Sequence, residues 1–486
     1  MAHHDGQPLE LELAAGSSQL DDDGHAPRTG NLWTCVAHII TAVIGCGVLA
    51  LSWSVAQLGW VGGPVAMVCF AFVTYVSAFL LSHCYMSPDS EKPQRNHTYM
   101  DAVRTHLGGC LALKSWKKHT WLCASLQYLN LYGTAVAYTI TTATCLGYSY
   151  AKSAPLTERL KCTTRDRAIK KANCYHDEGR DAPCGSHGDE HFYMLLFGAA
   201  QLVLSFIPNF HDMSRLSVVA AIMSFTYASI GFGLGLAKTI ENGAVKGSIA
   251  GVSMSTPTQK VWRVAQAIGD IAFAYPYTIV LLEIQDTLKS PPPESETMRK
   301  GNVIAVLTTT FFYLCVGCFG YAAFGNAAPG NLLTGFGFYE PYWLVDFANA
   351  CIVLHLLGGY QTGASPRPSR PNNAFVNKSY AIKVPGLGVS YKLNLQRLCF
   401  RMVYVASTTG LALVFPYFNE VLGVLGALIF WPLVIYLPVE MYCMQRQIMP
   451  WTRRWVALQV FSAVCFVVGT FAFVGSVEGV IRKRLG

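Results

Sequence analysis

Two long apolar segments of this chain are interrupted near their middles, and these interruptions limit what the chain can form. The first segment, residues 32–60, contains Gly45-Cys46-Gly47; the second, residues 261–282, contains Gly269-Asp270 and Tyr275-Pro276. In a membrane, unwound backbone is tolerated only where it is buried in protein or lines a cavity. Two interrupted segments about half a chain apart therefore predict a central binding site for a small polar solute.

The composition of the chain is that of a membrane protein. Hydrophobic residues make up 52% and charged residues only 13%, whereas soluble domains carry about 25% charged residues. About eleven apolar runs approach or exceed the roughly 18–20 residues that a spanning helix needs. They are residues 32–58, 60–84, 119–148, 192–209, 216–237, 261–282, 302–324, 341–361, 399–416, 421–443 and 455–481. The sequence predicts an all-α polytopic membrane protein.

The distribution of lysine and arginine predicts how the chain is oriented. Residues 1–28 are polar, without the apolar core of a signal peptide, and we expect a disordered cytosolic tail before a transmembrane domain at 29–486. The predicted cytosolic connections, including 362–400, are rich in Lys and Arg, whereas residues 325–340 contain neither. The loop 149–191 would lie outside the cytosol. The basic C-terminal end also falls outside if the number of spans is odd, which leaves the last span uncertain.

Charge and cysteine usage exclude several other functions. The net charge of +8 gathers in predicted cytosolic loops and forms no basic stripe with exposed aromatic residues, so we expect no nucleic-acid partner. The hydrophilic loop 149–191 contains three disulfide candidates, Cys162, Cys174 and Cys184. Histidines in the same loop match no compact zinc pattern, so we predict no metal site. Intramembrane His, Asp and Glu share no motif of a membrane enzyme, and nothing indicates an oligomeric state.

The first interruption has the chemistry of an anion site. Gly45 and Gly47 release the helical ladder and let a ligand approach the backbone closely. From about Val48 a new half-helix begins, and the free N–H groups at its start attract an anion such as a substrate carboxylate. We predict that the substrate contacts Ile44, Gly45, Cys46, Gly47 and Val48. The Gly-x-Gly pattern also suits close helix packing; the second interruption favours a binding site.

The second interruption supplies complementary chemistry. Pro276 lacks a donor and clashes with the carbonyl four residues earlier, near Ala272, so the helix cannot run straight through. Phe273 and Tyr275 are candidates for the pocket wall, and freed carbonyls around Ala274 would accept hydrogen bonds from an ammonium group. A half-helix for a carboxylate and carbonyls for an amine together predict a receptor for a zwitterionic amino acid.

Ionisable side chains within apolar segments cost roughly 2.5–3.5 kcal/mol at mid-helix, so each is a functional hypothesis. Asp270, beside the second interruption, is the first candidate for a proton or ammonium partner. Glu283 is another proton-coupling candidate, unless it holds the cytosolic end to a neighbouring helix. His38, before the first interruption, is a third, unless it is a structural histidine. Asp346 and His355 lie nearer the predicted interfaces and are assigned no role.

The third apolar segment carries a polar stripe. Gln127, Asn130, Thr134 and Tyr138 follow spacings of three, four and four residues, which place them on one helical face. We predict that this face lines the cavity or packs against the interrupted helices, and we include Asn130 among the residues that contact the substrate.

Three stretches of this sequence resemble a known family: LWTCVAHIITAVIGCGVLALSWSVAQLGWVGGP, then IGDIAFAYPY and LLEIQDTLKSPPP, then GALIFWPLVIYLPVEMY. They are similar to plant amino acid permeases of the amino acid/auxin permease superfamily, from about Thr29 to the last segment. The resemblance implies a LeuT-like fold of two inverted five-helix repeats plus one helix, with helices one and six discontinuous. It also implies plasma-membrane uptake of neutral and acidic amino acids, coupled to protons and without another cofactor.

The eighth segment departs from the family pattern. In the family it continues into more apolar residues after a Tyr-Gln pair, whereas here Tyr360-Gln361 is followed by TGASPRPSRPNN. Residues 341–361 are then barely long enough to span. An inactive or non-transporting isoform is therefore one alternative, and an auxin or GABA/proline carrier of the same superfamily is another.

Overall fold

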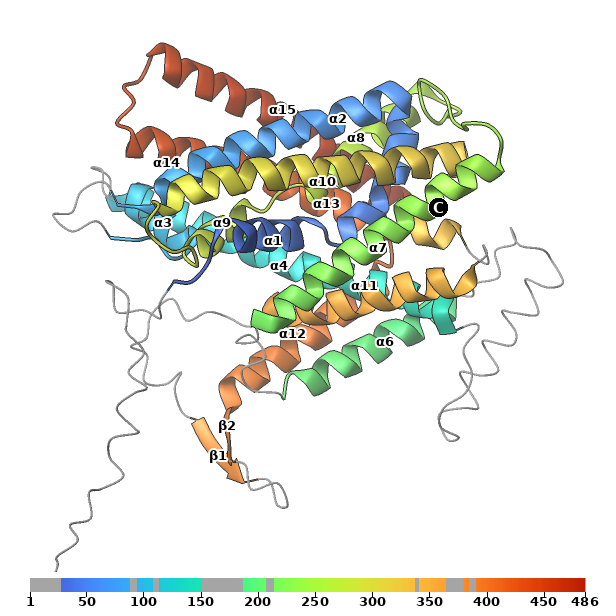
Figure 1. The fold of residues 1–486 in the computed structure, drawn as a ribbon, viewed down its shortest axis with the longest axis horizontal. Coiled ribbons are helices and arrows are strands. Elements are labelled where there is room, and N and C mark those ends of the chain that lie inside the picture. The colour runs from blue at the N-terminus through green and yellow to red at the C-terminus, as the bar shows by residue number, and fades with distance from the viewer. Residues whose placement is uncertain are drawn as a thin grey trace, which may run out of the picture.

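The computed structural model of this chain describes residues 28–87, 94–107, 113–150, 187–206, 214–336, 341–363, 379–383 and 390–485. The predicted tail up to residue 27 and the three cysteines of the loop 149–191 lie outside these residues. Most of the long helices run roughly along the longest axis of the molecule (Figure 1). The α-helices are α1 (Leu32–Val43), α2 (Leu51–Ser82), α3 (Tyr99–Leu107), α4 (Leu113–Tyr150), α6 (His187–Leu204), α7 (Ser214–Glu241), α8 (Pro257–Ala274), α9 (Thr278–Gln285), α10 (Glu294–Phe324), α11 (Tyr342–Gly363), α12 (Leu395–Val414), α13 (Phe418–Ile429), α14 (Leu437–Gln445) and α15 (Arg453–Leu485).

Each of the eleven predicted spans contains helix, which confirms the all-α polytopic fold. The first span consists of α1, a 3-10 turn at Cys46–Ala50 and the beginning of α2, and the sixth consists of α8 and α9. The tenth joins α13 and α14 through a π-helical turn at Phe430–Tyr436. Among the described residues, seven helical stretches are long and apolar enough to cross a bilayer by themselves.

A kink at Gly59 separates the first and second spans inside α2. Gly59 has φ +82°, and a β-carbon there would lie 2.1 Å from the carbonyl oxygen of Ile249. Glycine is the residue that adopts this backbone conformation without steric cost. The kink therefore lets one continuous helical segment supply two spans, as the apolar runs 32–58 and 60–84 predict.

Three spans pack on the span five positions later in the chain, and two further pairs correspond to each other across the two halves. The second span packs on the seventh (α2 on α10), the third on the eighth (α4 on α11) and the fourth on the ninth (α6 on α12). The first packs on the seventh (α1 on α10) and, correspondingly, the second on the sixth (α2 on α9). Because each repeat has an odd number of spans, the second repeat begins on the opposite side of the membrane. This arrangement is the inverted five-plus-five repeat that the resemblance implies.

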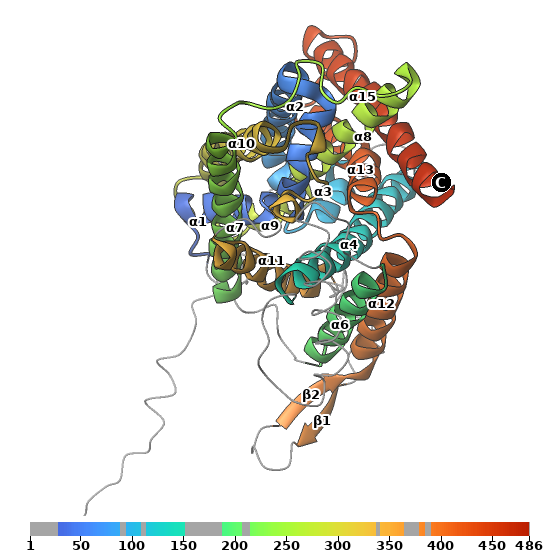
Figure 2. The same ribbon diagram turned by 90° about the vertical axis from the view of Figure 1, so that its right-hand side faces the viewer.

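The eleventh span lies at one edge of the bundle. Helix α15 packs on α8 and α13, and in both views it is at the opposite edge from α6 and α12, which lie side by side (Figures 1 and 2). The basic end of α15 has partners there: Arg482 pairs with Glu478, Lys483 with Glu420, and Arg484 donates to the carbonyl of Val414. Two of the three basic side chains at this end therefore have carboxylate partners. This pairing lowers the local positive charge, which fits the predicted orientation badly.

The chain just before α1 is tied to the end of α9. Backbone hydrogen bonds join Gly30 to Thr287 and Lys289, and the guanidinium of Arg28 lies 2.8 Å from the Asp286 carboxylate. The hydroxyl of Tyr85 donates to the same carboxylate at 2.7 Å, and His97 contacts it at 3.0 Å. Burial raises the pKa of the Asp286 carboxyl, but hydrogen bonds from Tyr85, Arg28 and His97 outweigh burial and hold that pKa below its usual value. Arg28, the last residue of the predicted tail, is therefore anchored to the helical domain.

The predicted connection 362–400 contains structure that we did not expect. Strands β1 (Ser379–Lys383) and β2 (Ser390–Asn394) form an antiparallel pair, in which Ala381 is opposite Lys392. The pair extends beyond the ends of α6 and α12 (Figure 2). Helix α12 begins at Leu395, inside the range predicted to be a loop. The two short strands are too polar to register in a search for apolar spans.

Candidate functional site

The first interruption opens the backbone between Val43 and Cys46. Helix α1 ends at Val43, Ile44 adopts φ −78° and ψ 84°, and Gly45 is extended. The hydroxyl of Tyr227, on α7, donates to the carbonyls of Ile44 and Gly45 at 3.1 and 3.0 Å. A buried tyrosine therefore partners the carbonyls that the lost helical turn leaves exposed.

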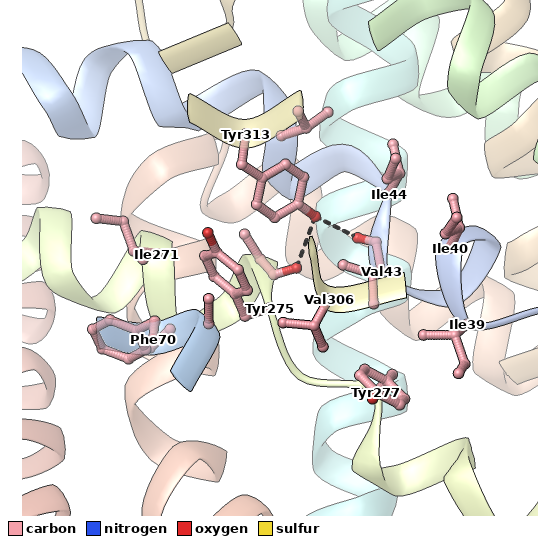
Figure 3. Packing of buried hydrophobic residues seen from close by; sticks show 14 of the residues in the cluster. Ile39, Ile40, Val43, Ile44, Phe70, Ile271, Tyr275, Tyr277, Val306 and Tyr313 are labelled. Atoms are coloured by element: carbon pink, nitrogen blue, oxygen red, sulfur yellow. Dashed lines mark hydrogen bonds between the residues drawn. The ribbon is translucent and has the colours of Figure 1, made fainter. Parts of the chain in front are cut away.

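The second interruption is a three-residue break at Tyr275–Tyr277. Helix α8 ends at Ala274 and α9 begins at Thr278, so the helix stops at the position that Pro276 predicts. The hydroxyl of Tyr313, on α10, lies 2.9 Å from the Ala274 carbonyl and 2.7 Å from the carbonyl of Val43 (Figure 3). One side chain thereby joins the ends of both interrupted helices.

The two interruptions meet directly. A β-carbon on Gly47 would lie 3.1 Å from the α-carbon of Ala274 and 3.2 Å from the ring of Phe273. Gly45 faces open space instead, since its nearest neighbour would be the Tyr138 hydroxyl at 4.0 Å. Gly47 therefore permits close contact of the two broken helices, and Gly45 leaves room beside them.

A cavity of about 410 Å³ lies beside both interruptions. Its wall combines backbone from α1, the 3-10 turn and α8 with polar and aromatic side chains from α4, α11 and α12. The residues that define its chemistry are His38, Thr41, Gly45, Cys46, Gly47, Asn130, Thr134, Tyr138, Phe273, Ala274, His355, Tyr360 and Tyr404. The cavity thus lies at the centre of the repeat, where the interrupted segments predict it.

The predicted substrate-binding residues divide into two groups. Gly45, Cys46, Gly47, Asn130, Phe273 and Ala274 line the cavity, whereas Ile44, Val48 and Tyr275 do not. Ile44 and Val48 are fully buried, and the ring of Tyr275 packs edge-on against Tyr313. Of the predicted stripe on α4, Asn130, Thr134 and Tyr138 line the cavity and Gln127 does not.

The backbone at the interruptions can contact both ends of a zwitterion. The new half-helix starts at Cys46, two residues earlier than predicted, and Gly45 supplies no side-chain cap. The first N–H groups of such a helix have no partner within it. On the other side, the carbonyls of Val43, Gly45 and Ala274 accept from tyrosine hydroxyls, and each carbonyl oxygen has a second lone pair.

The three proton-coupling candidates occupy different environments. His38 is half-buried and lines the cavity. Asp270 is completely buried one turn before the second interruption, but it does not line the cavity and instead faces Gly423 on α13. Glu283 is half-buried on α9 and also lies outside the cavity wall. The sequence shows that these groups lie near the breaks. The structure shows that His38 faces the cavity and that Asp270 faces α13.

His355, for which the sequence alone predicts no role, lines the cavity. Its Nδ1 atom lies 3.0 Å from the Ser224 hydroxyl and 3.2 Å from the Ala220 carbonyl oxygen. Its ring packs edge-on against Tyr227, which holds the first interruption. The only sequence signal for a role of His355 was its position as an ionisable residue within an apolar run. The sequence does not show which face of this helix packs against α7. In the part of the chain that the structure describes, no group of three His, Cys, Asp or Glu residues could hold a metal ion.

A helical bundle built from an inverted repeat, with two interrupted helices meeting at a central cavity, has the architecture of a secondary transporter. The model of the family "Transmembrane amino acid transporter protein" matches residues 28–482. The chain belongs to this family and is a multi-pass membrane transporter rather than an enzyme.

Several relatives from Arabidopsis thaliana cover almost the whole chain. "Probable amino acid permease 7" is 50% identical over 99% of this chain and 97% of its own length. "Amino acid permease 3" is 48% identical over 97% and 95%, respectively. A solved structure of a nucleobase–cation symport transporter, closed with bromovinylhydantoin bound, is similar with 12% identity and a TM-score of 0.46 over 94% of both chains.

Proposed function

We propose that this protein is a proton-coupled symporter that imports neutral and acidic amino acids across the plasma membrane by alternating access, with its N-terminus in the cytosol. The observation that carries the proposal is the meeting of the two interrupted helices at a cavity of about 410 Å³, within the range of roughly 300–1,000 Å³ typical of small-ligand sites. Membership of an amino acid transporter family and relatives named amino acid permeases support the substrate class.

Recognition of the amino acid uses backbone groups of both interruptions. The substrate carboxylate accepts from the N–H groups of Cys46 and Gly47 at the start of the half-helix, where the helix dipole also favours an anion. The ammonium group donates to the carbonyls of Gly45 and Ala274. The side chain then points towards Asn130 and the aromatic wall. Because the backbone makes the contacts common to all amino acids, this design supports a broad substrate range.

Proton coupling adds a titratable group to this receptor. His38, Asp270 and Glu283 are the candidates, and protonation couples the two gradients when the proton binds the two transport states with different affinity. The lysines and arginines of the predicted cytosolic connections support a cytosolic N-terminus. Protons serve as the coupling ion, and the mechanism needs no other cofactor.

Uptake by a transport-deficient yeast strain, measured across pH with a panel of labelled amino acids, tests the proposal. We expect neutral and acidic amino acids to accumulate more at acidic external pH. Gly45→Leu should abolish uptake at a normal surface level because the side chain fills the cavity. Gly233→Leu is the matched control, since Gly233 is exposed and a β-carbon there meets nothing within 4 Å. Normal uptake by the Gly45 variant would refute the site.

The same assay separates the alternatives. Preference for auxin, GABA or proline over the panel would identify a different carrier of the superfamily. A chain that reaches the surface and binds but does not transport amino acids would be a non-transporting isoform. That alternative rests on a short eighth span, but α11 has 22 residues, which span about 33 Å at 1.5 Å per residue. This length matches a hydrocarbon core of about 30 Å.

A further inference from the structure

Asp270 occupies a dry contact between α8 and α13. Its side chain is 0% exposed, and a β-carbon on Gly423 would lie 3.1 Å from its Oδ1 atom. Within the described chain, neither carboxyl oxygen has a hydrogen-bond partner at normal geometry. A buried carboxylate without compensation is unfavourable, so this environment requires the neutral, protonated acid.

The contact around Asp270 is made by backbone. A β-carbon on Gly426 would lie 2.3 Å from the Gly269 carbonyl oxygen and 2.5 Å from the Phe273 nitrogen. A β-carbon on Gly269 would in turn lie 2.7 Å from the Gly423 carbonyl oxygen. Such spacing leaves no room for water that could solvate a charge. Close packing of α8 on α13 is therefore compatible with neutral Asp270 and opposed by its ionised form.

Few groups from neighbouring helices act on Asp270. Helix α13 contributes the carboxylate of Glu420, α15 contributes the ammonium of Lys483, and α2 contributes only the Ser54 hydroxyl. Glu420 is 1% exposed, and its carboxylate lies 2.9 Å from the Lys483 ammonium. This pair neutralises itself. If both acids were ionised the cluster would carry one net negative charge, and one proton on Asp270 brings it to zero.

We propose that Asp270 binds the coupled proton at a site between α8 and α13, separate from the substrate cavity, with the Glu420–Lys483 pair setting the charge around it. The proposal rests on the proton coupling of the proposed function. When α8 and α13 are apart, water reaches the carboxylate and a proton adds to one of its oxygens. The neutral acid then allows α8 to close on α13.

The proton is released towards the substrate cavity, which lies close to Asp270 along α8. Asp270 lies four residues before Ala274, about 6 Å along the helix axis at 1.5 Å per residue, and Ala274 lines the cavity beside the two interruptions. The O–H bond of the acid breaks, and the proton passes to water entering the cavity. The resulting carboxylate opposes the closed packing of α8 on α13 and favours its return to the open arrangement. Closure is thus linked to one bound proton.

Purified protein in liposomes tests the site with two measurements. Accumulation of a labelled neutral amino acid is driven by an inward pH gradient of one unit, and exchange of internal for external substrate is measured without a gradient. One coupled proton supports about tenfold accumulation per pH unit. Asp270→Asn mimics the neutral acid, so we expect exchange to persist and accumulation to fall from about tenfold to none. Glu478→Gln is the matched control, because it removes a partly exposed carboxylate of α15 that pairs with Arg482 and should keep tenfold accumulation.

A charge test addresses the same site without altering Asp270. Glu420→Gln leaves Lys483 unpaired, which favours ionised Asp270 and should move half-maximal uptake to a lower pH. Lys483→Met leaves Glu420 unpaired, which favours neutral Asp270 and should move it to a higher pH. If Asp270→Asn does not fold, opposite shifts of half-maximal uptake in these two variants would still support the proton site at Asp270.

The possible outcomes distinguish a failure of the proton site at Asp270 from a failure of the proposed proton-coupled transport. A wild-type protein whose accumulation ignores the pH gradient would refute proton coupling itself. A coupled wild type with full accumulation by the Asp270 variant would refute this site and leave the proposed function intact. Shifts of half-maximal uptake in the same direction for both charge variants, or no shift in either, would also refute the site.

Discussion

Removal of one hydroxyl group should loosen both interrupted helices together. Tyr313 is fully buried, and its hydroxyl donates to Val43 at 2.7 Å and to Ala274 at 2.9 Å. The single hydroxyl hydrogen is shared between the two carbonyls, and losing it leaves buried acceptors without this partner, which costs roughly 1–3 kcal/mol, so Tyr313→Phe should cost about 2 kcal/mol. This free energy corresponds to a decrease of about 30-fold in the equilibrium between joined and separated helix ends.

A neighbouring tyrosine provides the matched control. Tyr275 is buried to the same degree and stacks edge-on against Tyr313, but its hydroxyl has no hydrogen-bond partner at normal geometry among the described residues. Tyr275→Phe therefore removes the same atom without removing a contact to the breaks, and its cost should stay near zero.

Thermal unfolding in detergent and uptake kinetics measure this difference. We expect Tyr313→Phe to melt at a lower temperature than both the wild type and Tyr275→Phe, and to take up substrate with a raised KM, because the backbone receptor is less well ordered. Equal melting temperatures and equal KM values for the two variants would show that the bridge between Val43 and Ala274 does not hold the site together.

Three further predictions follow from the packing. Gly47→Ala should reduce stability by about 1–3 kcal/mol through overpacking, whereas Gly45→Ala should melt normally; reversed melting temperatures would contradict the contact between the breaks. The depressed pKa of Asp286 means that its stabilising contribution is present above the usual carboxyl pKa of about 4 and is lost as the pH falls through the lower folded value; the melting advantage of wild type over Asp286→Asn should hold from pH 7 to 5 and shrink below about 4. Gln361→Leu removes the hydrogen bonds of a buried amide to Gln201 and should lower the melting temperature; an unchanged value would show that the end of α11 is not held there.

The sequence predicts the positions of the interruptions because local chemistry determines them. Gly45 and Gly47 weaken one helix and Pro276 ends the other, so breaks appear in the structure beside Gly45 and at Pro276. Gly269-Asp270, which we also expected to interrupt the second segment, lies inside the unbroken helix α8. The tyrosines that hold these breaks were not predictable. Tyr227 and Tyr313 lie within ordinary apolar segments, and no local pattern reveals that their hydroxyls reach backbone carbonyls on other helices.

The orientation of side chains around a helix was the second limit. Asp270 and Phe273 are both close to the second break in sequence, yet Phe273 lines the cavity and Asp270 faces α13. Three residues along a helix change the direction by about 300°, which leaves the two side chains about 60° apart around the helix axis, so residues near the same break can still face different neighbours. Only the packing partners decide which face meets the cavity, and Gly423 is more than 150 positions away in the sequence.

The two ends of the broken helices are held by different kinds of contact, and this difference has a mechanical consequence. At one end, α8 meets α13 through glycine backbone around a buried acid. At the other, the chain before α1 meets the end of α9 through the partly exposed Asp286 and its charged partners. Water can replace the partners of an exposed carboxylate but cannot enter the glycine contact without separating the helices. We therefore expect the polar end to open in response to solvent, and the α8–α13 end to open only when the charge on Asp270 changes.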